Sequence, residues 1–184
     1  MNDTIKVINS RRSVRKYKTT PIADAEIKTI AEAAIYAPSA MNQQKWHFTV
    51  VRSPEMIAKM NNAIRENLLN SGVEFLAERA KNPDFDVFHG APALIMVTAE
   101  EDARFTEIDC GAAAENIALA AESLNIGSCF IGMAEFLFAS DDASKIKQEM
   151  GIPENYRHII TVVLGYKDVE PPVPPKNIDA INYI

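Results

Sequence analysis

Apolar and polar residues alternate along the chain with two periods, which predict two kinds of element. Apolar residues that recur every three to four positions indicate helices, whereas short apolar runs rich in β-branched residues indicate strands. The predicted helices cover residues 3–10, 24–37, 54–82 with a break at 70–72, 105–124 and 142–150, and the predicted strands cover 46–51, 93–99, 128–132 and 158–166. This order predicts one domain, 1–184, in which helices and strands form layers.

Capping residues signal where several of these helices begin and end. Asp3 is expected to cap the first helix, and Asp141 or Asp142 to cap the last. Pro38 is expected to stop the second helix. Gly127 lies within reach of the left-handed position that ends the long helix before it. These residues set the predicted element boundaries.

The helix predicted over 105–124 is unusual because apolar residues lie on nearly all of its sides. A helix of this kind is expected to be buried all round. The small residues at 112–114 also permit close approach of a second helix. We therefore favour a helix that is both core and subunit interface, with core alone as the alternative. Ile5 and Ile8 of the first helix are likewise expected to face inward.

Residues 168–184 are expected to form an extended arm. Its PPVPP segment fits neither helix nor sheet, and its last apolar residues include Ile181 and Tyr183. Such an arm is expected to pack either on its own body or on a neighbouring subunit.

Composition and charge limit the classes of function. The 184 residues are 47% apolar and 24% charged, as in ordinary globular proteins. A net charge of -6 and a pI near 5.1 argue against general binding to nucleic acids or membrane surfaces, which requires broad positive potential. Cys110 and Cys129 fit no metal-ligand spacing and are expected to be buried thiols in a reducing compartment. Without a predicted signal peptide or membrane span, a cytoplasmic protein is expected.

A local anion site is indicated by the segment RRSVRK at 11–16. Arg11 and Arg15 are four positions apart, so they share a face in a helix or a strand, and Ser13 joins them only if the segment is extended. Guanidinium groups offer paired donors to phosphate oxygens. The alternative is a solvated basic patch at the end of a helix.

The segment APSAMNQQKWHF at 37–48 concentrates polar side chains just before a predicted strand. Ser39, Asn42, Gln43 and Gln44 provide hydroxyl and carboxamide groups that suit the edge of a flat heterocycle. An ordinary polar loop is the alternative.

These segments together resemble the nitroreductase family of FMN-dependent oxidoreductases. RRSVRKY, the pattern A-P-S-x-x-N-x-Q-x-W-x-F, ENIALAAESLNIGSCFIG, and HIITVVLGY followed by PPVPPK occur in the family's order. The resemblance implies an α+β, three-layer α/β/α-like fold with a central mixed, mostly antiparallel sheet flanked by helices. It also implies a long buried central helix and a C-terminal arm that packs on the partner subunit.

The resemblance also implies a set of FMN contacts. The positions that would hold the phosphate and reach the pyrimidine edge are Arg11, Arg12, Ser13 and Arg15, with Lys176 returning to the same phosphate. The loop that would contact the ring system from the other subunit contains Pro38, Ser39, Ala40, Met41, Asn42 and Gln44. The backbone of Ile131 and Gly132 would approach the reactive N5. Lys45 departs from the proline that many members have there, Cys129 falls near the flavin face, and no contact is assigned to 56–90.

The implied activity is hydride transfer from NAD(P)H through FMN N5 to nitroaromatic, quinone or similar flat acceptors, in a ping-pong mechanism. No side chain is needed as nucleophile or general base, and no metal is expected. A homodimer with two FMN sites across its interface is implied. The alternatives are another flavin reaction, such as dehalogenation or oxidation of a specific metabolite, and a non-enzymatic module that docks an acidic partner.

Overall fold

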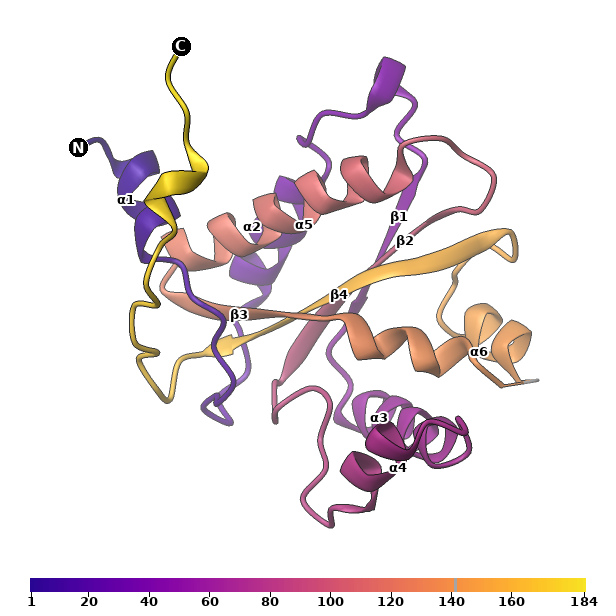
Figure 1. Ribbon diagram of the computed structural model, residues 1–184. Helices are drawn as coiled ribbons and strands as arrows, with labels where there is room; N and C mark the ends of the chain where they lie inside the picture. Colours follow the sequence, from indigo (N-terminus) through magenta and orange to yellow (C-terminus); the bar gives the residue numbers. More distant parts are fainter. Residues whose placement is uncertain (141) are drawn as a thin grey trace.

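Four strands form one sheet in the computed structural model, which describes residues 1–140 and 142–184 (Figure 1). The strands are β1 (Trp46–Val51), β2 (Ala93–Glu100), β3 (Ile126–Ile131) and β4 (Tyr156–Tyr166), and their order in the sheet is β1-β2-β4-β3. Every neighbouring pair is antiparallel. An isolated bridge between Ser13 and Ser128 adds a parallel pairing beside β3.

Helices cover both faces of this sheet. They are α1 (Asp3–Ser10), α2 (Asp24–Ala34), α3 (Pro54–Leu69), α4 (Glu74–Lys81), α5 (Thr106–Ser123) and α6 (Ala143–Glu149), and three short 3-10 turns are η1 (Ala40–Asn42), η2 (Gly132–Phe138) and η3 (Ile178–Ala180). The order of helices and strands agrees with the order expected from the sequence. The α+β, three-layer expectation is confirmed.

The uninterrupted apolar run of β2 is explained by these two layers. Side chains of a strand alternate between the faces of its sheet. Ile95 and Val97 therefore pack with α2 and α5, while Leu94 and Met96 pack with α3 and η2 on the other face. A strand covered on both sides can be apolar at every position.

Three helix boundaries differ from the sequence expectation. Asn2, and not Asp3, caps α1, because its side chain accepts a hydrogen bond from the Ile5 amide at 3.0 Å. Helix α2 ends at Ala34, before Pro38 is reached. Asn125 takes the left-handed conformation after α5 with φ of 64°, and asparagine tolerates this conformation better than most residues.

Gly127 lies inside β3 instead of in the turn before it. A Cβ atom at this position would lie 2.9 Å from the side chain of Val14. Its lack of a side chain therefore permits close packing against the basic segment.

The expected capping of α6 by an aspartate is not supported by a hydrogen bond. Asp142 occupies the cap position, but its side chain makes no capping hydrogen bond, and Asp141 lies outside the described residues.

The single chain leaves part of α5 uncovered, so the expectation of burial all round is wrong at this level. Its inner side is buried through residues such as Cys110, Ala113, Ile117 and Ala121, but Ile108 is 71% exposed. Ile5 and Ile8 of α1 are also exposed instead of inward-facing. Helix α1 packs against α5, and both of these neighbouring helices carry apolar side chains that are exposed to solvent in the single chain.

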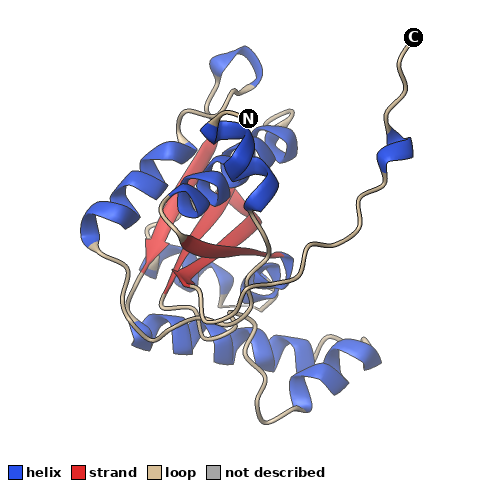
Figure 2. Cartoon of the chain, turned by 90° about the vertical axis from the view of Figure 1, so that its left-hand side faces the viewer, coloured by secondary structure: helices blue, strands red, loops and turns tan. Residues whose placement is uncertain are grey.

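The C-terminal arm, residues 168–184, leaves the body of the chain (Figure 2). Two interactions with Lys16 attach the start of the arm. The Asp168 amide donates to the Lys16 carbonyl at 3.1 Å, and the side chains of the same two residues form an ion pair at 2.9 Å. Beyond this point Val173, Ile178, Ile181 and Tyr183 are all exposed. The extended arm is confirmed, and beyond its start these apolar side chains are not packed on the described residues of their own chain. In the part of the chain that the structure describes, no helix has the length and apolar character to cross a membrane.

Candidate functional site

The basic segment runs extended beside β3 after α1 ends. The Val14 amide donates to the Ser128 carbonyl at 2.9 Å, and Tyr17 forms a second bridge with Lys167. Val14 points into the core, fully buried. Because neighbouring side chains of an extended segment point to opposite sides, Arg11, Ser13 and Arg15 share the other side. Ser13 therefore joins the two arginines, as expected for an extended segment.

These three side chains lie near enough to the thiol of Cys129 on β3 to affect its pKa. Burial raises the pKa of this thiol, and the charge of Arg15, the Ser13 hydroxyl and the charge of Arg11 each oppose that rise. Cys129 itself is buried and bonded to no other cysteine. The cluster thus brings two guanidiniums and a hydroxyl near the same residue of the strand.

The guanidiniums of Arg11 and Arg12 have unsatisfied hydrogen-bonding capacity. Arg11 Nε lies 3.2 Å from Glu115 Oε1, an ion pair whose geometry leaves the Nε hydrogen without an aligned acceptor. Arg12 Nη1 donates to the carbonyls of Asn9 at 2.7 Å and Arg11 at 2.6 Å, while its buried Nε has no acceptor among the described residues. Buried polar groups normally have partners. An anion bound here would supply acceptors.

Two further basic residues near this cluster have no signal in the sequence. Burial lowers the pKa of His89, and the neighbouring charge of Arg15 lowers it further. The charge of Asp86 raises this pKa in part, and the charge of Arg79 lowers it. His89 also has a left-handed φ of 58°. Arg79 and His89 lie far along the chain from Arg15, so only the fold brings them together.

The loop before β1 has an unusual backbone. Met41, Asn42 and Gln44 have φ values of 53°, 55° and 52°, in the left-handed region that non-glycine residues rarely adopt. The Ser39 hydroxyl accepts from the Gln44 amide at 3.1 Å, and Gln44 Nε2 donates to Asn42 Oδ1 at 2.9 Å. The Ala40 amide donates to both oxygens of Asp109, at 3.2 and 3.1 Å.

The structure brings together only some of the residues implied by the resemblance. Ile131 and Gly132 lie at the end of β3, on the strand that carries Cys129, and the space where Gly132 lacks a side chain is open. The loop at 38–44 projects near the start of α5, whereas the basic segment lies toward the opposite end of that helix; the loop is the small purple turn at the top of Figure 1. Lys176 lies on the arm that leaves the body. These two parts do not meet the basic segment within one chain.

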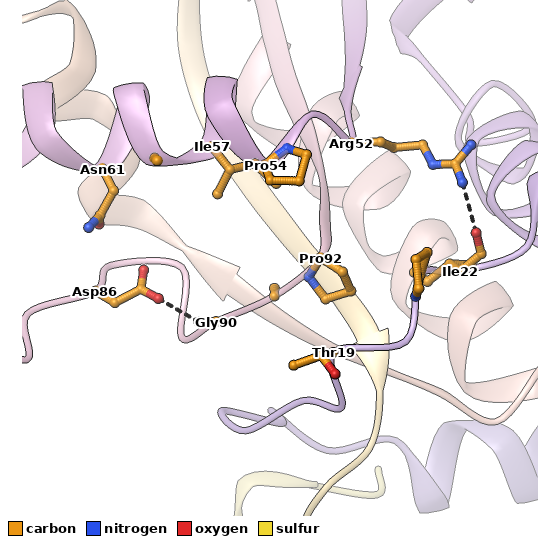
Figure 3. A pocket seen from close by; sticks show the side chains of 12 residues that line it. Thr19, Ile22, Arg52, Pro54, Ile57, Asn61, Asp86, Gly90 and Pro92 are labelled. Atoms are coloured by element: carbon orange, nitrogen blue, oxygen red, sulfur yellow. Dashed lines mark hydrogen bonds between the residues drawn. The ribbon is translucent and has the colours of Figure 1, made fainter.

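A cavity of about 560 Å³ lies elsewhere, between α3, residues 19–22 and the loop at 86–92 (Figure 3). Its walls are largely apolar, and Arg52 at its edge is held by Asp24 and by the Ile22 carbonyl at 2.9 Å. None of the residues implied by the resemblance lines it. A site assembled from Arg11, the loop at 38–44 and Lys176 is therefore not this cavity.

The family model described as "Nitroreductase family" matches residues 8–166 of the chain. The chain belongs to the nitroreductase family. The expected family membership and fold are confirmed.

Individual relatives agree with this membership. A protein of Archaeoglobus fulgidus, provisionally named NADH dehydrogenase/NAD(P)H nitroreductase, is 36% identical over 174 residues, which cover 90% of this chain and 86% of the relative. A nitroreductase crystallised with bound FMN from Bacteroides fragilis is 31% identical, covers 100% of both chains and has a TM-score of 0.95. Another, with bound FMN, from Desulfitobacterium hafniense is 34% identical with a TM-score of 0.91, over 100% of this chain and 99% of that one.

Proposed function

We propose that this nitroreductase-family protein is an FMN-dependent NAD(P)H oxidoreductase. The observation that carries the proposal is the cluster of Arg11, Ser13 and Arg15 beside β3, where the buried Nε donors of Arg11 and of the neighbouring Arg12 lack aligned acceptors among the described residues. It occurs on a fold whose solved neighbours were crystallised with FMN.

The cluster fits the phosphate end of FMN. A phosphate group accepts several hydrogen bonds and attracts guanidinium ions strongly. Arg11 and Ser13 would hold this group, whereas Arg15, with Arg79 and His89 near it, would lie toward the pyrimidine edge. Arg12 binds the backbone at the end of α1, so its larger effect would be to fix the turn into the segment. Lys176 would join the phosphate if the arm folds back.

The ring system would be contacted by the loop of a second subunit. The loop at 38–44 projects from the body, with Met41 81% exposed at its tip. A homodimer would also cover the open side of α5, the exposed Ile5 and Ile8, and the apolar end of the arm. Each FMN site would then combine one chain's basic segment with the partner's loop.

Bound FMN would supply hydride chemistry at N5, with NAD(P)H as donor and a nitroaromatic, quinone or similar flat molecule as acceptor. Donor and acceptor would use the same exposed ring face in turn, which gives ping-pong kinetics. Arg15 would stabilise negative charge at the pyrimidine edge. The open backbone at Gly132 would leave room beside the strand end.

A cytoplasmic location is part of this proposal. Cys110 and Cys129 are both free, and they lie in core clusters on opposite faces of the sheet. Disulfide bonds are uncommon in reducing compartments, so two free, buried thiols are consistent with such a compartment.

The test is spectroscopic. Purified protein is expected to be yellow, with absorbance near ~450 nm from oxidised flavin. NADH or NADPH should bleach this absorbance without air, and addition of a quinone or nitroaromatic should restore it. Protein that rejects added FMN would overturn the proposal. Flavin that neither nicotinamide reduces would overturn the NAD(P)H assignment while leaving FMN binding intact.

A further inference from the structure

We propose that Asp109, which none of the sequence motifs singled out, is a positioning residue for the cofactor. Its carboxylate fixes the loop at 38–44 in the place on the protein from which it would contact the flavin ring. The inference rests on the proposed function and adds a residue that does not itself touch the cofactor.

The loop needs an external restraint because its backbone is costly. Left-handed non-glycine residues are less stable than their ordinary conformations and persist only where surrounding contacts fix them. Three of them occur between 41 and 44. The contacts of Ser39, Asn42 and Gln44 are internal to the loop, so they move with it. They hold its shape without setting its place on the protein.

Asp109 supplies the connection to the body. Its carboxylate accepts the Ala40 amide with both oxygens, across 69 positions of sequence. Among the described residues, this is the side-chain hydrogen bond that joins the loop at 38–44 to another element. The residue is 9% exposed, so water competes little for the carboxylate. A bond to a charged acceptor is also stronger than one to a neutral group.

Helix α5 makes this connection rigid. Asp109 lies in its first turn, where the helix dipole favours a carboxylate. The residues around it, Thr106, Cys110 and Ala113, are buried. The same helix carries Glu115, which pairs with Arg11. Six residues of helix separate the two carboxylates, about 9 Å along the axis. One helix thus contacts both the basic segment and the loop.

The experiment compares Asp109→Asn with Glu107→Gln. Both substitutions remove one negative charge from the first turn of α5, but Glu107 pairs with Arg157 and does not contact the loop. We expect Asp109→Asn to raise the FMN Kd by about tenfold, since a charged acceptor becomes neutral. The visible circular dichroism of bound flavin should change with it. Glu107→Gln should bind within about twofold of wild type, and Asp109→Glu should restore part of the lost affinity.

A second variant acts from the loop side. Ala40→Pro removes the amide hydrogen that Asp109 accepts and leaves the carboxylate in place. Position 40 begins the turn η1 and follows an extended Ser39, with φ of -134° and ψ of 148°, which is a backbone that proline accepts. Ala40→Pro should reproduce the loss of FMN affinity without changing the melting temperature appreciably. It keeps the test valid if Asp109→Asn folds poorly.

Several outcomes would overturn the assignment. Wild-type affinity and dichroism in Asp109→Asn would do so, as would equal losses in Asp109→Asn and Glu107→Gln. Wild-type protein that binds no FMN would end the proposed function instead. The loop assignment would then be decided by trypsin cleavage after the exposed Lys45, which should be faster in Asp109→Asn than in Glu107→Gln. Equal cleavage rates would reject it.

Discussion

The basic segment and the loop at 38–44 are implied to bind one cofactor, yet they are built in opposite ways. The basic segment is packed: Val14 is fully buried and hydrogen-bonded to β3, and Arg11 pairs with Glu115. The loop is exposed and left-handed, and one carboxylate joins it to the body. The comparison suggests a division of work. Under the proposed function, the phosphate-binding half would lie mainly within one chain, with Lys176 joining it from the arm, whereas the ring-binding half would be completed between two chains.

The largest effect is expected from removing the arm at 171–184. Its apolar side chains, Ile178, Ile181 and Tyr183, are exposed and find no partner among the described residues of their own chain. Burying such a side chain contributes about 1.5–3 kcal/mol, and part of this is lost in ordering the arm. We expect the truncated dimer to dissociate about 100-fold more easily, from a net loss of about 3 kcal/mol.

Sedimentation over a concentration series measures this dissociation. Full-length Ile181→Ser with Tyr183→Ser is the control that keeps the length of the arm but removes its apolar end, and it should reproduce most of the loss. A truncated protein that remains dimeric at nanomolar concentration would contradict the division between chains.

Arg11→Ala tests the half that one chain completes. The guanidinium is expected to contribute about 1.5–3 kcal/mol to FMN binding, as hydrogen bonds to charged groups do. Titration of apoprotein with FMN measures the change. Lys6→Ala removes an exposed cation of α1 and is the matched control for net charge. Equal affinities for Arg11→Ala and wild type would place the phosphate elsewhere.

Gly127→Ala tests how tightly the basic segment is packed. The added methyl group would meet Val14 at 2.9 Å. Because the clash is with a buried side chain against the backbone of β3, we expect a loss of about 1–3 kcal/mol in the free energy of unfolding. Urea denaturation measures it. Gly72→Ala would not serve as the control, because Gly72 has a left-handed φ of 73°. Gly111→Ala, inside α5 and with open space around it, should cause no loss and should stabilise by about 0.5–1 kcal/mol, because alanine is the better helix former.

The contrast between the two regions also explains how far the sequence reaches. Short apolar runs rich in β-branched residues predicted every strand, and the spacing at 11–16 grouped Ser13 with Arg11 and Arg15 for the extended conformation that the structure has. These features depend on neighbours in the sequence. His89 was missed because its proximity to Arg15 and to Arg79 arises from the fold alone. Asp109 was missed for the same reason: its hydrogen bond to Ala40 spans 69 positions. The apolar residues around α5 favoured a helix that is both core and subunit interface, but they could not show which side the single chain leaves uncovered, because composition does not say where the chain stops packing.

The smallest effect on stability is expected from Met41→Gly, in the exposed loop at 38–44. Met41 is 81% exposed and has a left-handed φ of 53°. Glycine adopts this conformation without steric cost but loses more entropy on folding, so the two terms oppose each other. We expect the free energy of unfolding of the separated chain to change by less than about 0.5 kcal/mol. Urea denaturation at a concentration where the protein is monomeric measures it, with Gly127→Ala alongside. A large loss in Met41→Gly would mean that the loop is packed within its own chain, and the two halves of the site would no longer differ.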